Sequence, residues 1–175
     1  MFDWSLLDSD FADRVRQVLS SLQIKGVIMI PYFGIRTPIQ QAKLWCKSRD
    51  IQTITNEITK LQEQGCNYLV EILKDVNPEN GEKVTDSLPG LSWHNWGMAL
   101  DCYWEKDGAP SWDGSGEGYH AYADEAVSCG LTAGMNFVSF KDPGHIQLHS
   151  KEIPNLYTLV QVDQAMKEKF GSSLT

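Results

Sequence analysis

The mixture of helical and strand periodicity constrains the fold of this chain more than any other feature. Apolar residues recur at three- and four-residue spacing in five predicted helices, at about residues 8–22, 38–48, 54–76, 119–129 and 155–170. Short apolar or strand-like runs predict strands over 26–30, 98–104, 137–140 and 145–149. These elements do not follow a regular β-α-β order, which favours the α+β class. We expect a small antiparallel sheet flanked by helices.

Several local signals define element boundaries. Thr37 is suited to cap a helix whose first residue is Pro38. Gly65 interrupts the helical pattern over 54–76 at a cost of about 1 kcal/mol relative to Ala, so a break is allowed there. Residues 82–92 and 106–118 are predicted to be loops.

Length and charge limit the organisation and the partners of the chain. A chain of 175 residues predicts one domain over residues 1–175, within which about 50–85 reads as a helical insertion. The net charge of -8 disfavours binding to nucleic acid or to anionic lipid. No apolar run reaches the roughly 20 residues that span a bilayer, so we expect no membrane insertion.

The cysteines and the N-terminal residues bear on the compartment. Residues 1–17 lack the basic start and apolar core of a secretory signal, so we expect synthesis in the cytoplasm without a signal peptide. No pair of the four cysteines has C-x-x-C spacing, which argues against a cysteine-rich zinc knuckle. We interpret them as free thiols, although an even number also allows disulfides.

Two histidine segments suggest a metal site. One contains His94 and Asp101, and the other contains Asp142 and His145. Zinc binds imidazole nitrogen and carboxylate oxygen, and three protein ligands with one open position are typical of a catalytic site. His94, Asp101 and His145 could supply that set, with Asp142 facing the open position. Isolated histidines are more often packed or exposed than ligating, so chemistry alone leaves the question open.

The motifs strengthen this interpretation. Residues 92–101 fit S-x-H-x-x-G-x-A-x-D, and Asp142 to His145 fits D/E-x-x-H. Both motifs resemble those of the LAS-type zinc peptidases, a group that includes D-alanyl-D-alanine carboxypeptidases. The detail is most similar to the phage endolysin branch of L-alanyl-D-glutamate peptidases, on residues 34–38, 89–94 and 130–142. The segment 132–136 departs from the Trp-Gly-Gly-like stretch of that branch.

The resemblance implies roles for individual residues. It makes His94, Asp101 and His145 the ligands of one Zn²⁺ per chain, and it makes Asp142 the catalytic carboxylate. Arg36 matches an arginine that the family places near the acyl group or carboxylate of the substrate, which makes it both a substrate-binding residue and a catalytic one that helps to stabilise the oxyanion. A structural salt bridge is the alternative.

Other residues of the motif region have less specific roles. We expect Ser92 to orient the site through hydrogen bonds, and His120 and His149 not to be ligands. Trp93 and Trp96, with the nearby aromatic residues, form either a wall of the substrate groove or part of the packing. Cys102 should point away from the metal if its strand alternates.

The activity implied by the resemblance is hydrolysis of the stem peptide of bacterial peptidoglycan, at the L-alanyl-D-glutamate bond, by an endolysin that causes cell lysis. One alternative is a D-alanyl-D-alanine carboxypeptidase or dipeptidase. Another is an inactive wall-binding or phage structural module. We expect a monomer without a separate wall-binding domain that acts on the wall after release, by phage lysis or specialised export.

Overall fold

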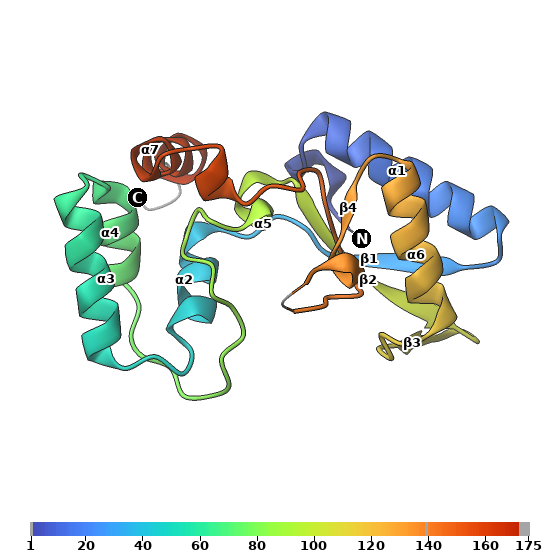
Figure 1. The fold of residues 1–175 in the computed structure, drawn as a ribbon, viewed down its shortest axis with the longest axis horizontal. Coiled ribbons are helices and arrows are strands. Elements are labelled where there is room, and N and C mark those ends of the chain that lie inside the picture. Colours follow the sequence, from blue (N-terminus) through green and yellow to red (C-terminus); the bar gives the residue numbers. More distant parts are fainter. Residues whose placement is uncertain (1, 139, 172–175) are drawn as a thin grey trace. The chain divides into compact units, whose positions relative to one another are not determined.

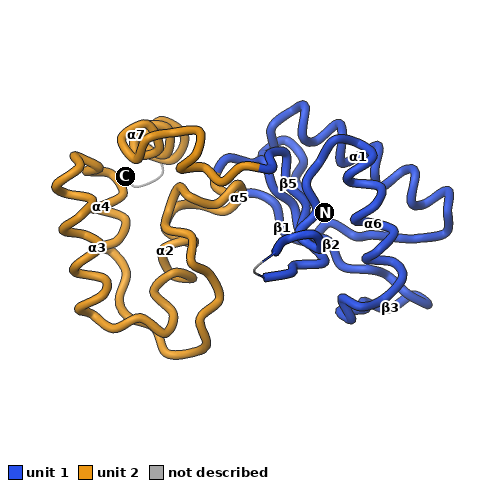
Figure 2. The backbone as a smooth tube through the Cα atoms, viewed as in Figure 1, with its two compact units in different colours: residues 1–35, 96–150 blue, residues 36–95, 151–175 orange. Residues whose placement is uncertain are grey.

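The computed structural model describes residues 2–138 and 140–171, which divide into two compact units. Unit 1 comprises residues 1–35 and 96–150, and unit 2 comprises residues 36–95 and 151–175 (Figure 2). Each unit is therefore built from two separate segments of the sequence. The expected single domain over 1–175, with its insertion at about 50–85, stays a prediction.

Unit 1 contains the sheet. Its strands lie in the order β1-β2-β5-β4, and β3 also pairs with β2. Every pairing between these strands is antiparallel, which confirms the predicted α+β class with a small antiparallel sheet. The strands are β1 (Ile28–Phe33), β2 (Ala99–Lys106), β3 (Ala109–Ser111), β4 (Thr132–Ala133) and β5 (His145–Gln147).

Two helices of unit 1, α1 (Ser9–Ile24) and α6 (Glu117–Ser128), pack against the sheet (Figure 1). The Asp8 side chain caps α1 by accepting the backbone N–H of Phe11 at 3.1 Å. Short 3₁₀ turns, η1 (Trp4–Leu6) and η2 (Gly134–Asn136), complete the unit. Fully buried apolar residues of both helices and of the sheet form one core, including Phe11, Leu22, Leu100, Tyr122 and Ile146.

The strand β3 corrects the predicted loop over 106–118. A tight turn at Asp107 and Gly108, with φ of 53° and 76°, reverses the chain between β2 and β3. Positive φ at both central residues is the geometry of a type I′ hairpin, which favours the Asp-Gly dipeptide. This dipeptide was therefore the sequence signal for the hairpin.

The strand predicted over 137–140 is wrong for the described residues of that stretch, while residue 139 lies outside them. Phe137, Val138 and Phe140 belong to no strand, and Val138 and Phe140 are exposed. The apolar spacing resembled a strand, but these side chains have no sheet face to cover.

Unit 2 is helical. Its helices are α2 (Pro38–Cys46), α3 (Ile51–Glu63), α4 (Asn67–Lys74), the first three residues of α5 (Trp93–Trp96), the 3₁₀ turn η3 (Ile153–Asn155) and α7 (Leu159–Phe170). Helix α4 packs against α2, α3 and α7. The allowed break at Gly65 is present, and its φ of +79° explains why a glycine ends α3.

Capping residues hold several of these helices in place. Thr37 and Gln40 form a capping box at α2, with Pro38 at the first turn as predicted. The N-terminus of α4 has no cap from its own chain segment, but Asp163 of α7 accepts the backbone N–H of Leu69 at 2.8 Å. The short helix α5 lies just beyond the predicted loop over 82–92, and four residues are too few to show helical periodicity.

Among the described residues, no helix combines the length and the hydrophobicity that a bilayer crossing requires.

Candidate metal centre and catalytic site

The centre of the site is a cross-strand pair in unit 1. Asp101 of β2 lies directly opposite His145 of β5 in the antiparallel register. Side chains alternate along a strand, so Leu100 and Cys102 enter the core while Asp101 points to the other face of the sheet. Cys102 is buried in that core, as predicted.

Hydrogen bonds orient the imidazole of His145 through both of its nitrogens. Nδ1 lies 2.9 Å from Oδ1 of Asp101, and Nε2 lies 3.0 Å from Oε1 of Gln147. Burial by itself lowers the pKa of His145, but the hydrogen bond and the negative charge of Asp101 outweigh it and raise the pKa. The pair therefore stabilises positive charge at this position.

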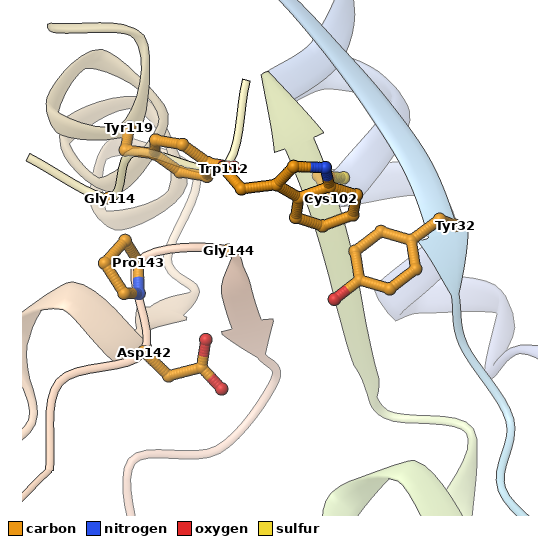
Figure 3. A pocket seen from close by; sticks show the side chains of 8 residues that line it. All are labelled: Tyr32, Cys102, Trp112, Gly114, Tyr119, Asp142, Pro143 and Gly144. Carbon is orange, nitrogen blue, oxygen red and sulfur yellow. The ribbon is translucent and has the colours of Figure 1, made fainter. Parts of the chain in front are cut away.

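Asp142 lies on the turn that enters β5. Its backbone N–H donates to the carbonyl of Gly134 at 3.0 Å, and its own carbonyl accepts the N–H of His145 at 3.1 Å. The approach to Gly134 is close, since a Cβ at that position would lie 2.4 Å from the carbonyl oxygen of Asp142. The turn is thus packed tightly on η2, with the Asp142 carboxylate lining a pocket (Figure 3).

The three residues predicted to bind zinc form a possible metal site. His94, Asp101 and His145 each offer one ligand atom, and these atoms lie within 4.8 Å of one another. His94 is buried in the first turn of α5, and His145 is buried as well. Two imidazoles and one carboxylate are donors that Zn²⁺ accepts, and they are too few to close a tetrahedral site. The residues present therefore fit a catalytic zinc ion, and His120 and His149 are not in the group.

Arg36 is fixed by a polar network within unit 2. Its backbone N–H donates to the carbonyl of His94 at 3.0 Å, and its carbonyl accepts the side-chain amide of Asn95 at 2.8 Å. One guanidinium nitrogen, Nη1, donates to Oε1 of Gln41 at 2.9 Å. The amide of Gln41 in turn donates to the carbonyl of Ser87 at 2.7 Å. These hydrogen bonds fix the position of Arg36 relative to His94 within unit 2.

Sequence reasoning missed the structural roles of Gln41 and Asn95. Both side chains are completely buried, although each carries an amide. Buried amides are costly unless they are hydrogen-bonded, so each acts as a connector in the network. The available signal was a glutamine among the apolar residues of the 38–46 helix face.

The remaining predicted site residues differ in exposure. Trp93 is buried, and its indole N–H donates to the carbonyl of Lys151 at 3.1 Å. Trp96 and Ser92 are half-buried, and the carbonyl of Ser92 accepts the N–H of Asn95 at 2.9 Å. The packing of Trp93 suits a structural residue, and the substrate-binding roles of all three stay predictions.

An α+β fold with two histidines and a carboxylate as possible metal ligands is typical of a metal-dependent hydrolase. The family model described as D-alanyl-D-alanine carboxypeptidase, VanY, matches residues 5–124. Because this match covers more than half of the chain, the protein belongs to the D-alanyl-D-alanine carboxypeptidase family. The prediction of a peptidase of the LAS type is confirmed. The match includes His94 and Asp101 and ends before Asp142 and His145.

Comparison with other proteins adds little beyond the family. No curated protein matches the chain significantly. Among solved structures, the L-Ala D-Glu endopeptidase ChiX of Serratia marcescens has 17% identity and a TM-score of 0.45, over 83% of both chains. A variant of the vancomycin resistance D,D-pentapeptidase VanY in complex with Zn(II) has 13% identity and a TM-score of 0.49, over 93% of this chain and 78% of the other. Likenesses at this level leave the substrate to be argued from the site itself.

Proposed function

We propose that the protein is a zinc peptidase that cleaves the stem peptide of bacterial peptidoglycan between L-alanine and D-glutamate. The observation that carries the peptidase proposal is the cross-strand pair of Asp101 and His145, with Asp142 on the turn beside it. Membership in the carboxypeptidase family supports peptidoglycan as the substrate class. The choice of bond rests on the similarity of residues 34–38, 89–94 and 130–142 to the endolysin branch.

In this proposal His94, Asp101 and His145 hold one Zn²⁺. Bound zinc supplies a nucleophilic water at neutral pH and polarises the scissile carbonyl. Asp101 also orients the ring of His145, because Oδ1 of its carboxylate lies 2.9 Å from Nδ1.

The carboxylate of Asp142 moves the protons. As general base, it accepts a proton from the attacking water and then donates it to the nitrogen of the leaving amine. The backbone hydrogen bonds that tie Asp142 to Gly134 and His145 limit its movement between these two steps. Proton transfer of this kind contributes about 10²- to 10⁴-fold to the rate.

Arg36 binds a carboxylate of the substrate. A planar guanidinium holds a carboxylate through two parallel hydrogen bonds, and Gln41 restrains one nitrogen of the group. Both candidate reactions need such a cation, because the residue beyond the scissile bond carries a free carboxylate in each. A local positive group also offsets the net charge of -8.

The second candidate is a D-alanyl-D-alanine carboxypeptidase, which the description of the matching family favours. It uses the same residues in the same roles and differs only in the bond that is cut. Digestion of defined muropeptides, followed by mass spectrometry, separates the two reactions. Fragments ending in L-alanine and starting at D-glutamate support the first proposal, whereas loss of terminal D-alanine alone establishes the second.

We further propose that the enzyme acts as a monomeric endolysin, made in the bacterial cytoplasm and released to the wall during phage lysis or by a specialised exporter. To test this role, purified enzyme is added to host cells whose outer layer has been permeabilised, and the turbidity of the cell suspension is followed. An unchanged turbidity at enzyme concentrations that digest isolated peptidoglycan would contradict the role.

A further inference from the structure

Tyr32 lies where the strand β1 departs from regular pairing with β2. Pro31 pairs with Cys102, and Phe33 pairs with Asp101. Tyr32 has no partner residue of its own in this register, so it is the extra residue of a β-bulge. Bulges often occur beside active sites, where they change the direction of a side chain. The register therefore places Tyr32 next to Asp101, one of the proposed zinc ligands.

The ring of Tyr32 lies on the face of the sheet that carries Asp101. Side chains alternate along β2, so Tyr103 points to the same face as Asp101. The ring of Tyr32 lies 6.2 Å from that of Tyr103 and 5.2 Å from that of Trp112, between centroids. The rings of Tyr103 and Trp112 lie 5.4 Å apart. Contacts with two neighbouring rings thus restrict the orientation of the Tyr32 side chain.

Tyr32 and Asp142 line the same pocket of unit 1. This pocket has a volume of about 130 Å³, and the turn from Asp142 to Gly144 forms part of its lining. In Figure 3 the hydroxyl of Tyr32 points toward the side on which the Asp142 carboxylate lies. A sphere of 130 Å³ has a radius of about 3 Å, so a group that enters the pocket lies close to both side chains.

The backbone fixes the two sides of this pocket relative to each other. Strand β2 lies between β1, which carries Tyr32, and β5, which follows the turn of Asp142. The N–H of Cys102 in β2 donates to the carbonyl of Gly144 at 2.9 Å. A Cβ at Gly144 would lie 2.7 Å from the carbonyl oxygen of Cys102, so the turn packs directly on β2. The phenol and the carboxylate are therefore positioned by one strand.

The hydroxyl of Tyr32 is available to a ligand. Tyr32 is 49% exposed, and its hydroxyl has no hydrogen-bond partner among the residues that the structure describes. Burial, together with the negative charges of Asp101 and Asp142, raises the pKa of Tyr32 to about 12, so the phenol stays protonated at neutral pH. A protonated phenol can donate a hydrogen bond without adding a charge to the site.

We propose that Tyr32 is a further catalytic residue, whose hydroxyl donates a hydrogen bond to the oxygen of the scissile carbonyl as that oxygen gains negative charge. The inference rests on the proposed function and is the same for both candidate bonds. The attacking water and the leaving nitrogen exchange protons with Asp142, whereas the carbonyl oxygen becomes a stronger acceptor during the reaction. A donor that is held in place beforehand stabilises this oxygen more in the transition state than in the ground state.

The substitution Tyr32→Phe removes the hydroxyl and keeps the ring packing. Loss of one oxyanion donor costs about 10²- to 10³-fold in kcat where donors alone stabilise the charge. Because bound zinc shares this task, we expect kcat on a defined muropeptide to fall by about 10- to 10²-fold, with KM and zinc content unchanged. The control is Tyr68→Phe in α4, since Tyr68 does not line the pocket. It should behave as wild type.

A binding measurement distinguishes a transition-state contact from a structural role. A phosphinate analogue of the stem peptide carries a tetrahedral group in place of the scissile amide and resembles the transition state. Calorimetry should show that Tyr32→Phe weakens its binding by the same factor as kcat/KM. The affinity for the peptide products should stay unchanged, because they lack the tetrahedral group.

The outcomes separate this role from the proposed function. Wild-type kcat in Tyr32→Phe, or a higher KM alone, overturns the role of Tyr32 and leaves the proposed function intact. Reduced zinc content or altered circular dichroism in Tyr32→Phe likewise overturns it, because the hydroxyl would then be structural. Absence of hydrolysis by the wild-type enzyme for every stem peptide overturns the proposed function and the role of Tyr32 with it.

Discussion

The substitution Gly134→Ala tests how the catalytic turn is positioned. An alanine Cβ would lie 2.4 Å from the carbonyl oxygen of Asp142 and 3.0 Å from Cβ of His145. Ordinary contacts of a Cβ begin at 3.4 Å, so the Asp142 carbonyl must move by about 3.4 − 2.4 = 1.0 Å. This carbonyl and the adjacent N–H belong to the hydrogen bonds that connect η2, Asp142 and His145. The whole turn should therefore move with it.

Two effects of different size should follow. Overpacking costs about 1–3 kcal/mol, which for a chain of this length lowers Tm by roughly 2–12 °C. A shift of about 1 Å in a catalytic group costs on the order of 10²-fold in rate. We expect kcat on a defined muropeptide to fall by about that factor while the protein remains folded.

The assay compares kcat, zinc content and Tm for Gly134→Ala and for Gly171→Ala. The control is matched because the nearest atom to a Cβ at Gly171 is Cγ of Lys167 at 3.4 Å, and the φ of Gly171 is negative. Gly171→Ala should behave as wild type. Wild-type kcat in Gly134→Ala would refute the argument that close packing on Gly134 positions Asp142.

Further predictions concern the metal, the arginine and the thiols. His94→Ala and His145→Ala should lose bound zinc by metal analysis, whereas Asp142→Asn should keep it and lose about 10²-fold or more of its turnover; full zinc in both histidine variants would exclude this ligand set. Gln41→Leu should raise KM for carboxylate-bearing peptides and lower the free energy of unfolding by about 1–3 kcal/mol, because the guanidinium of Arg36 loses a hydrogen-bond acceptor and the carbonyl of Ser87 loses a donor. An unchanged KM together with an unchanged midpoint of urea unfolding would contradict this. Cys129 is half-buried and should react first with a thiol reagent in the native protein, since burial raises the pKa of the other three thiols; four equal native rates would contradict it.

Much of the fold could be predicted because local chemistry determined it. Thr37 and Pro38 start a helix by capping, and Gly65 ends one through its positive φ. The elements that were missed are short. The helix at 93–96 has too few residues for a periodic pattern, and β3 exists because of its pairing with β2, which a local pattern does not contain.

The candidate site likewise has residues that the sequence predicts and residues whose roles appear only in the folded structure. Motif spacing predicted Asp101 and His145 as members of a metal site, because the chemistry depends on the residue types themselves, and the structure groups them as a possible one. It could not identify Gln41, since its role depends on contacts with residues that are distant in sequence. Glutamine in a helix is common, and only tertiary packing distinguishes this one.

The register between β2 and β5 connects folding to the proposed chemistry. Leu100 lies opposite Ile146, and Asp101 lies opposite His145. Leu100 and Ile146 are both fully buried in the core of unit 1, so the hydrophobic effect determines the register at that step. A slip of one residue would place an apolar side chain opposite a polar one and separate the carboxylate from the imidazole. The core thus determines which two polar residues meet on the opposite face, so the possible metal site depends on a pair of apolar side chains that are not themselves among its ligand residues.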